Sequence, residues 1–203
     1  MHMLTLDPRV KEFSAQPFTI DLIDRRILRT PDELKDARTK HRKRIGPKFY
    51  TPDFSFELHG PLLGVLEVKL EGYEGDDVYQ AKLAQAREVI EANGHIFPTV
   101  IFPKDPKHPL RGNLLLLNKA ALREDLRPSP ELVLAIESAC GNDSITLGTL
   151  CSTLGISPNL TPSLFVFGVL GGDLMHHAIN NSLPVNLAFG DLSHLQFLSE
   201  VGD

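Results

Sequence analysis

The sequence contains no lysine or arginine after Arg127, although 21 such residues precede that point. The stretch that follows carries seven acidic side chains and no basic one, whereas the first 127 residues carry 19 acids and 21 bases. A surface that binds nucleic-acid phosphates needs lysine or arginine. Any contact with nucleic acid is therefore expected mainly in the N-terminal part of the chain.

Cysteines and long apolar runs are also scarce. Cys140 and Cys151 are too few for a disulfide scaffold and form no C-x-x-C pair, which favours buried thiols in a reducing cytoplasm. No apolar run is long enough to span a bilayer, and the N-terminus has no signal-peptide pattern. These absences predict a cytoplasmic protein with no membrane partner.

A proline-rich stretch, residues 103–109, separates two regions with different patterns. Residues 1–108 alternate between strand-like and helix-like patterns and predict an α/β domain with a mixed sheet. Residues 109–203 are mainly helical in pattern. They predict a smaller helical, winged-helix-like domain with a wing strand at 184–188.

One helix of the first region should begin at Asp76 or Asp77 and end at Asn93-Gly94, because its apolar residues recur at spacings of four and three. The strand that carries Glu67 precedes this helix, and an apolar run at 96–102 follows it. A strand, a helix and a strand in this order form a β-α-β unit. The two strands should therefore run parallel.

The most informative residues are Asp53, in Tyr50-Thr51-Pro52-Asp53-Phe54, and the pair Glu67 and Lys69 on the next strand. Residues i and i+2 of a strand face the same side, so Glu67 and Lys69 should point together. If the connecting loop is centred on Gly60, Asp53 lies opposite Glu67, with Cβ atoms about 4.5–5.5 Å apart. Two carboxylates at this spacing can share a hard divalent cation beside a phosphodiester.

The alternative for these residues is a surface hairpin whose outer face carries solvated charges. The strand at Glu67 is apolar on both faces, which is typical of a central, buried strand. A buried charge without a partner costs free energy. Partners are therefore expected for Glu67 and Lys69, and a functional site is favoured over the surface hairpin.

With these residues in view, the chain resembles the TnsA-type transposon endonucleases of the PD-(D/E)xK nuclease superfamily. The resemblance covers roughly the first half of the chain. It rests on four segments: Leu6-Asp7-Pro8-x-Val10, Gln16-Pro17-Phe18, Tyr50-Thr51-Pro52-Asp53-Phe54 and Glu67-Val68-Lys69. It implies a restriction-endonuclease-like fold, a mixed sheet flanked by helices, with a small winged-helix-like C-terminal domain.

The resemblance also implies a function. Asp53 and Glu67 would bind catalytic Mg²⁺, with Mn²⁺ able to substitute, and Lys69 would complete the catalytic site. The implied reaction is hydrolytic nicking of double-stranded DNA at the 5′ ends of a transposon. The implied partners are a transposase that acts on the 3′ ends and a regulatory ATPase.

The chain departs from the family pattern at one position. Such enzymes usually carry a further catalytic glutamate on a helix just before the segment that matches Leu6-Asp7-Pro8, and this sequence has none there. Glu12 and Glu33 are the nearest acids of that type, but Glu33 fits a helix-capping role better. Two hypotheses follow: a shortened enzyme with weaker metal binding, or a catalytically silent subunit that serves as an assembly factor in a transposition complex.

A basic segment precedes the proposed site. Thr30-Pro31-Asp32-Glu33 is typical of a helix start, and the helix should run to about Arg44. The segment is denser in positive charge than solubility requires, although charge runs usually mark a solvated face. Contact with the DNA backbone is expected from the following residues: Lys35, Arg38, Lys40, Arg42, Lys43 and Arg44.

The second region gives a different expectation. The helix expected from Pro162 offers no base-reading side chain apart from Ser163, and no lysine or arginine follows Arg127. Direct reading of DNA bases, as in a transcriptional regulator, is therefore disfavoured. A protein-binding or dimerising module is predicted instead, with self-association of the chain as one form of it.

Overall fold

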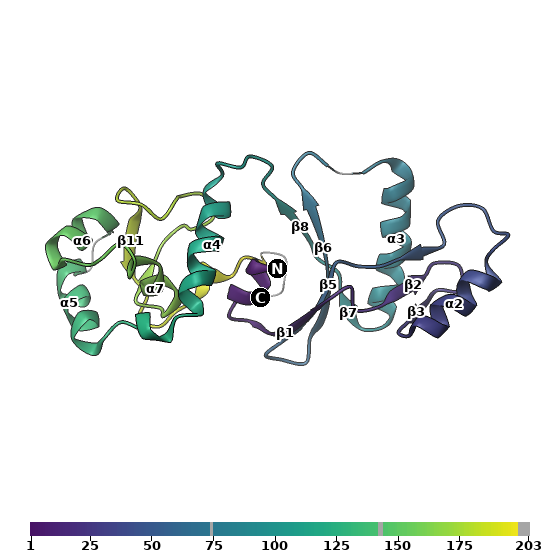
Figure 1. Cartoon of the computed structure of the whole chain (residues 1–203), viewed down its shortest axis with the longest axis horizontal. Coiled ribbons are helices and arrows are strands. Elements are labelled where there is room, and N and C mark those ends of the chain that lie inside the picture. The colour runs from purple at the N-terminus through teal and green to yellow at the C-terminus, as the bar shows by residue number, and fades with distance from the viewer. Residues whose placement is uncertain (74, 142–143, 199–203) are drawn as a thin grey trace. The chain divides into compact units, whose positions relative to one another are not determined.

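A computed structural model describes residues 1–73, 75–141 and 144–198, which form two compact units (Figure 1). The N-terminal unit is Arg9–Lys104, and the C-terminal unit combines Met1–Pro8 with the described residues from Asp105 to Leu198. The boundary lies inside the expected proline-rich stretch. The first eight residues, however, belong to the C-terminal unit rather than to a 1–108 domain, because the apolar side chains of helix α1 (His2–Leu6) are buried against helix α4 (Pro109–Ala121).

The N-terminal unit contains a five-stranded mixed sheet. Its main path has the order β1-β5-β6-β7, and β8 also pairs with β6. The strands are β1 (Val10–Ala15), β5 (Phe54–Leu58), β6 (Leu63–Leu70), β7 (His95–Ile96) and β8 (Thr99–Phe102). The single strand expected at 96–102 is thus divided in two, because Pro98 has no N–H to donate to a ladder.

Helix α3 (Asp77–Ala92) connects β6 to β7 and β8, and both of these strands run parallel to β6, as predicted. The Asp76 side chain caps the helix by accepting a hydrogen bond from the Tyr79 N–H at 2.8 Å. The apolar face of α3 packs on Val65 of the sheet and on neighbouring side chains. β6 is central, but only its middle is buried, since Val68 and Leu70 near its end are 37% and 41% exposed.

A second, antiparallel sheet has the order β3-β2-β4 and carries helix α2 (Pro31–Lys40) beside it (Figure 1). Its strands are β2 (Thr19–Asp21), β3 (Arg26–Leu28) and β4 (Phe49–Tyr50). The capping box expected at Thr30 and Glu33 is present. The helix ends at Lys40 rather than at Arg44, because His41 turns its side chain into the buried space beside β2.

The C-terminal unit is built from helices and a small sheet of order β10-β11-β9. Helix α6 (Leu147–Leu154) is ended by Gly155, which adopts the left-handed conformation with φ +64°. The helix expected from Pro162 is helix α7, which is short, and a strand follows it. The other elements are η1 (Glu124–Leu126), α5 (Pro130–Cys140), β9 (Ile145–Thr146), α7 (Thr161–Val166), β10 (Leu170–Gly171), β11 (Pro184–Leu187) and η2 (Ser193–Leu195).

The protein is thus an α/β protein with a mixed sheet flanked by helices. Within the described residues, no helix combines the length and the apolar character that crossing a membrane requires. Both cysteines are free thiols: Cys140 is buried, as expected, whereas Cys151 is partly exposed.

Candidate functional site

The hairpin of β5 and β6 has the register expected from a loop centred on Gly60. Phe54 pairs with Leu66 and Phe56 with Gly64, and the same register continued by one residue places Asp53 opposite Glu67. Gly64 helps to fix this register, because a Cβ there would lie only 2.0 Å from the Phe56 ring. Opposed residues of an antiparallel pair face the same side, so this register directs the two acids to one face, with Asp53 one residue before the start of β5.

Glu67 is 5% exposed, and each of its two carboxylate oxygens accepts a hydrogen bond from a tyrosine. The Tyr50 hydroxyl, from β4, donates to Oε2, and the Tyr79 hydroxyl, from the first turn of α3, donates to Oε1. Burial raises the pKa of both hydroxyls, and the hydrogen bond that each donates to Glu67 raises its pKa further. Both tyrosines are therefore neutral donors at physiological pH, and they supply the partners that a buried carboxylate needs.

Asp53 and Lys69 lie beside this group. The Asp53 carboxylate accepts a hydrogen bond from the Val68 N–H at 2.8 Å, and its charge also contributes to the raised pKa of both tyrosines. The Lys69 Nζ atom lies 4.4 Å from the centroid of the Tyr79 ring. Lys82 of α3 lies over the same ring at 5.1 Å. Two ammonium groups and two carboxylates thus surround one pair of tyrosines.

A hollow of about 430 Å³ opens at this point. Glu67 and Lys69 line it together with Tyr79 and the capping residue Asp76, while Asp53 lies outside the lining. The structure thus brings the three expected residues to one end of the hairpin. The two tyrosines donate hydrogen bonds to the Glu67 carboxylate.

The two candidate replacements for the upstream glutamate lie elsewhere in the unit. The Glu33 carboxylate accepts hydrogen bonds from the backbone N–H groups of Arg29 and Thr30 at 2.7 and 2.9 Å, which confirms its capping role. These bonds lower the pKa of Glu33. Glu12 is exposed on β1, where it pairs with Glu57 of β5.

The basic residues 35–44 are all exposed, whether on α2 or in the turn that follows it. A shallow hollow of about 420 Å³ lies along this surface and includes Lys35, Arg38 and Arg42. Lys40 differs from the others, because its Nζ atom lies 2.5 Å from a carboxylate oxygen of Asp24. The remaining five basic side chains can donate hydrogen bonds to phosphate oxygens.

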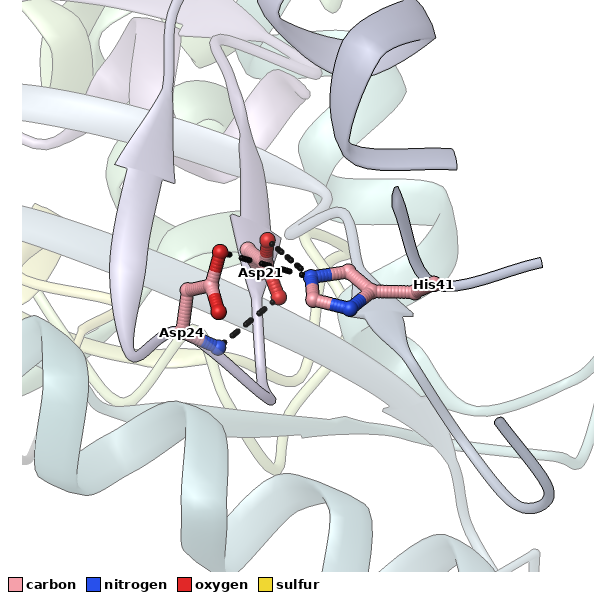
Figure 2. A group of neighbouring side chains, drawn as sticks. All are labelled: Asp21, Asp24 and His41. Atoms are coloured by element: carbon pink, nitrogen blue, oxygen red, sulfur yellow. Dashed lines mark hydrogen bonds and ion pairs between the residues drawn. The ribbon is translucent and has the colours of Figure 1, made fainter. Parts of the chain in front are cut away.

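Two features were not predicted from the sequence. The first is the pair of tyrosines that donate to Glu67, Tyr50 and Tyr79, although Tyr50 belongs to the predicted segment that contains Asp53. The second feature is a cluster of Asp21, Asp24 and His41, whose side chains point toward one another (Figure 2). Their separation along the chain matches no common metal-ligand spacing, so only folding reveals them as neighbours.

The C-terminal unit offers a different kind of surface. Helix α7, the expected counterpart of a recognition helix, is buried along its whole length except for Val166, which is partly exposed. A hollow of about 690 Å³ lies between α4, η1 and the start of α7 and is lined by apolar side chains with Lys119 and Arg123.

Compared with protein-family models and with curated protein sequences, the chain gives no significant match.

Proposed function

We propose that the N-terminal unit is a metal-dependent DNA endonuclease that acts at transposon ends within a heteromeric transposase. The observation that carries this proposal is the register of the hairpin, in which Phe54 pairs with Leu66. Continued by one residue, this register would set Asp53 opposite Glu67, and Lys69 would share the strand face of Glu67. The open hollow beside Glu67 and Lys69 supports it, because a phosphodiester must reach these groups. The restriction to transposon ends rests on the family resemblance.

The donor set fits Mg²⁺. A carboxylate oxygen has two lone-pair directions, so Glu67 can accept its tyrosine hydrogen bonds and still offer an oxygen to a cation. Asp53 would supply the second carboxylate, and Mn²⁺ suits the same hard ligands. The bound metal would polarise the scissile phosphate and lower the pKa of a water molecule. Lys69 would stabilise the negative charge that develops during attack.

The basic segment 35–44 is proposed to hold the DNA backbone. Its side chains are exposed, and all lysines and arginines of the chain lie at or before Arg127. The C-terminal unit is proposed as a winged-helix-like module that binds the partner transposase, the ATPase or a second copy of the chain. Its buried α7 and its lack of basic residues after Arg127 support protein binding over base reading.

One observation favours the alternative, a catalytically silent assembly subunit. Both Glu67 oxygens already have neutral hydrogen-bond donors, so the buried carboxylate is satisfied without a cation. In an active enzyme these bonds coexist with metal ligation. In a silent subunit they replace it.

Calorimetric titration with Mg²⁺ and with Mn²⁺ separates the two functions. The enzyme should bind either ion, and Asp53→Asn should weaken binding at least about tenfold, since it removes a charged ligand. Asp36→Asn, which removes an exposed charge on α2, is the matched control and should leave the affinity unchanged. Nicking of supercoiled plasmid in the presence of partner proteins should follow the same order. Absence of metal binding together with absence of nicking would establish the silent subunit.

DNA binding is tested by its salt dependence. Replacing Arg38 and Arg42 by alanine should weaken binding of a DNA duplex and lower the magnitude of the salt slope by roughly one for each lost phosphate contact. Arg87→Ala changes an exposed arginine of α3 that pairs with Glu91 and serves as the control. Equal salt slopes for the wild type, the double variant and Arg87→Ala would show that the basic segment is not part of the proposed interface.

A further inference from the structure

The side chains of Asp21, Asp24 and His41 meet in the N-terminal unit, at the junction of β2, the β2–β3 turn and the end of α2 (Figure 2). Asp21 is completely buried and His41 is 3% exposed. The His41 Nε2 atom lies 3.0 Å from Oδ2 of Asp21 and 3.4 Å from Oδ2 of Asp24. One imidazole nitrogen is thus directed at two carboxylates at the same time.

The other Asp21 oxygen is already satisfied. Oδ1 accepts hydrogen bonds from the backbone N–H groups of Ile23 and Asp24, both at 3.0 Å. These bonds fix the orientation of the carboxylate and leave Oδ2 directed at His41. Backbone hydrogen bonds of this kind orient ligating carboxylates in metal sites.

The spacing fits a tetrahedral cation. With metal–ligand distances near 2.0–2.1 Å, neighbouring ligand atoms lie about 3.3 Å apart, which the two distances from Nε2 bracket. The three ligand atoms all lie within 4.8 Å of one another. One imidazole and two carboxylates suit Zn²⁺, whereas Mg²⁺ prefers oxygen ligands alone.

We propose that Asp21, Asp24 and His41 form a Zn²⁺ site that ties the end of the basic helix α2 to the β2–β3 hairpin. Water would complete the four-coordinate shell. Asp21 is paired with Phe49, next to Tyr50, so the site also lies beside the strand that supports Glu67. This inference does not depend on nuclease activity, because it concerns different residues and a different ion.

The competing description is a metal-free cluster, in which His41 is hydrogen-bonded to Asp21 and Lys40 forms an ion pair with Asp24. Lys40 distinguishes the two descriptions. Its ammonium competes with a cation for Oδ2 of Asp24. If these residues bind zinc, the Lys40→Ala variant should bind Zn²⁺ more tightly than the wild type. If the cluster is only an ion-pair network, the variant should show no response to zinc.

The experiment is a calorimetric and thermal-unfolding titration of the untagged full-length chain with Zn²⁺. All three tyrosines lie in the N-terminal unit and the chain has no tryptophan, so tyrosine fluorescence follows that unit alone. Zn²⁺ should raise the unfolding midpoint of the wild type. Asp24→Asn should weaken zinc binding at least about tenfold, as expected for loss of a ligand, and Lys40→Ala should strengthen it.

Two controls make the result specific. Asp36→Asn makes the same charge change at an exposed position of α2, and His176→Ala removes a surface histidine that contacts Asp173. Both should bind zinc as the wild type does. His41→Gln should abolish binding, and its tyrosine signal without metal reports whether the variant still folds. Wild-type affinity in Asp24→Asn, or no zinc-dependent change in wild type and Lys40→Ala, would overturn the proposal.

Discussion

In the N-terminal unit the buried polar side chains are mainly ionisable, namely Asp21, His41 and Glu67, whereas in the C-terminal unit they are mainly neutral. An ionisable group is costly to bury and persists only with partners placed around it. A neutral group such as Asn113 can be satisfied by backbone atoms alone. The contrast agrees with the proposed roles of the two units, a site for chemistry or binding in the N-terminal unit and polar groups that stabilise the fold in the C-terminal unit.

The largest expected effect concerns Asn113, a buried polar residue of the C-terminal unit, where such residues are expected to stabilise the fold. Its amide donates to the carbonyl oxygens of Leu174 and His177 at 2.9 and 2.7 Å and accepts from the Ile179 N–H at 2.9 Å. Asn113→Ala should destabilise the C-terminal unit by about 2–4 kcal/mol, because it leaves one buried and two partly buried backbone groups without their side-chain partner. Urea unfolding followed by far-UV circular dichroism measures this.

The control for that experiment is Asn118→Ala, a change of the same type at a partly exposed position of the same helix. Its effect should be far smaller. Tyrosine fluorescence should report no change in the N-terminal unit for either variant. A loss in the tyrosine transition with Asn113→Ala would show that the two units are not independent, and the comparison would fail.

The next effect concerns the two tyrosines on Glu67. Tyr50→Phe removes a donor to a buried carboxylate and should cost about 1.5–3 kcal/mol. Tyr79→Phe should cost less, about 1 kcal/mol, because Tyr79 lines the open hollow and solvent can replace its hydroxyl. Chemical unfolding monitored by near-UV circular dichroism checks the order, and Tyr73→Phe, at an exposed position, is the control. The reverse order would show that Tyr79 is the principal partner of Glu67.

Helix caps provide a smaller and more direct comparison between the units. Thr30 caps α2 in a capping box with Glu33, and Ser129 caps α5 with its hydroxyl alone. Thr30→Ala should cost about 1 kcal/mol and Ser129→Ala somewhat less, since a single hydrogen bond is lost there. The tyrosine-fluorescence transition, which follows the N-terminal unit, should shift for Thr30→Ala and stay unchanged for Ser129→Ala. A shift of that transition in Ser129→Ala would contradict the comparison.

The smallest effect is a pH dependence that each unit should show through one histidine. Burial lowers the pKa of His95 in the N-terminal unit and of His194 in the C-terminal unit, although the bond from His194 to the Phe165 carbonyl partly opposes the shift. The unfolded chain then binds protons at a higher pH than the folded one. Stability should be full above about pH 6.5 and fall as the pH drops toward the folded pKa of each histidine.

Histidine NMR titration measures the two pKa values, and urea unfolding across this pH range measures the linked loss of stability. His95→Gln and His194→Gln should each flatten the pH dependence of their own unit. His59→Gln, at an exposed position, should leave both slopes unchanged. A pKa above about 6.5, the ordinary histidine value, for either residue would contradict the expected burial effect.

Much of the local structure could be predicted from the sequence because local signals suffice for it. The capping box at Thr30 and the parallel strands around α3 follow from the pattern of side chains near each element. The hairpin register could also be predicted, since a loop centred on Gly60 admits one pairing. The end of α2 at Lys40 could not, because the buried position of His41 depends on Asp21 of β2, which is 20 residues away in the chain.

The order of residues was enough to show where the lysines and arginines are concentrated, which strand carries Glu67 and Lys69, and which register the hairpin takes. It was not enough to show what surrounds these groups. Two tyrosines from separate elements satisfy Glu67, the first eight residues join the C-terminal unit, and Asp21, Asp24 and His41 converge. The physical reason is that partners of buried groups come from distant segments, and their choice is made by packing of the whole unit rather than by spacing along the chain.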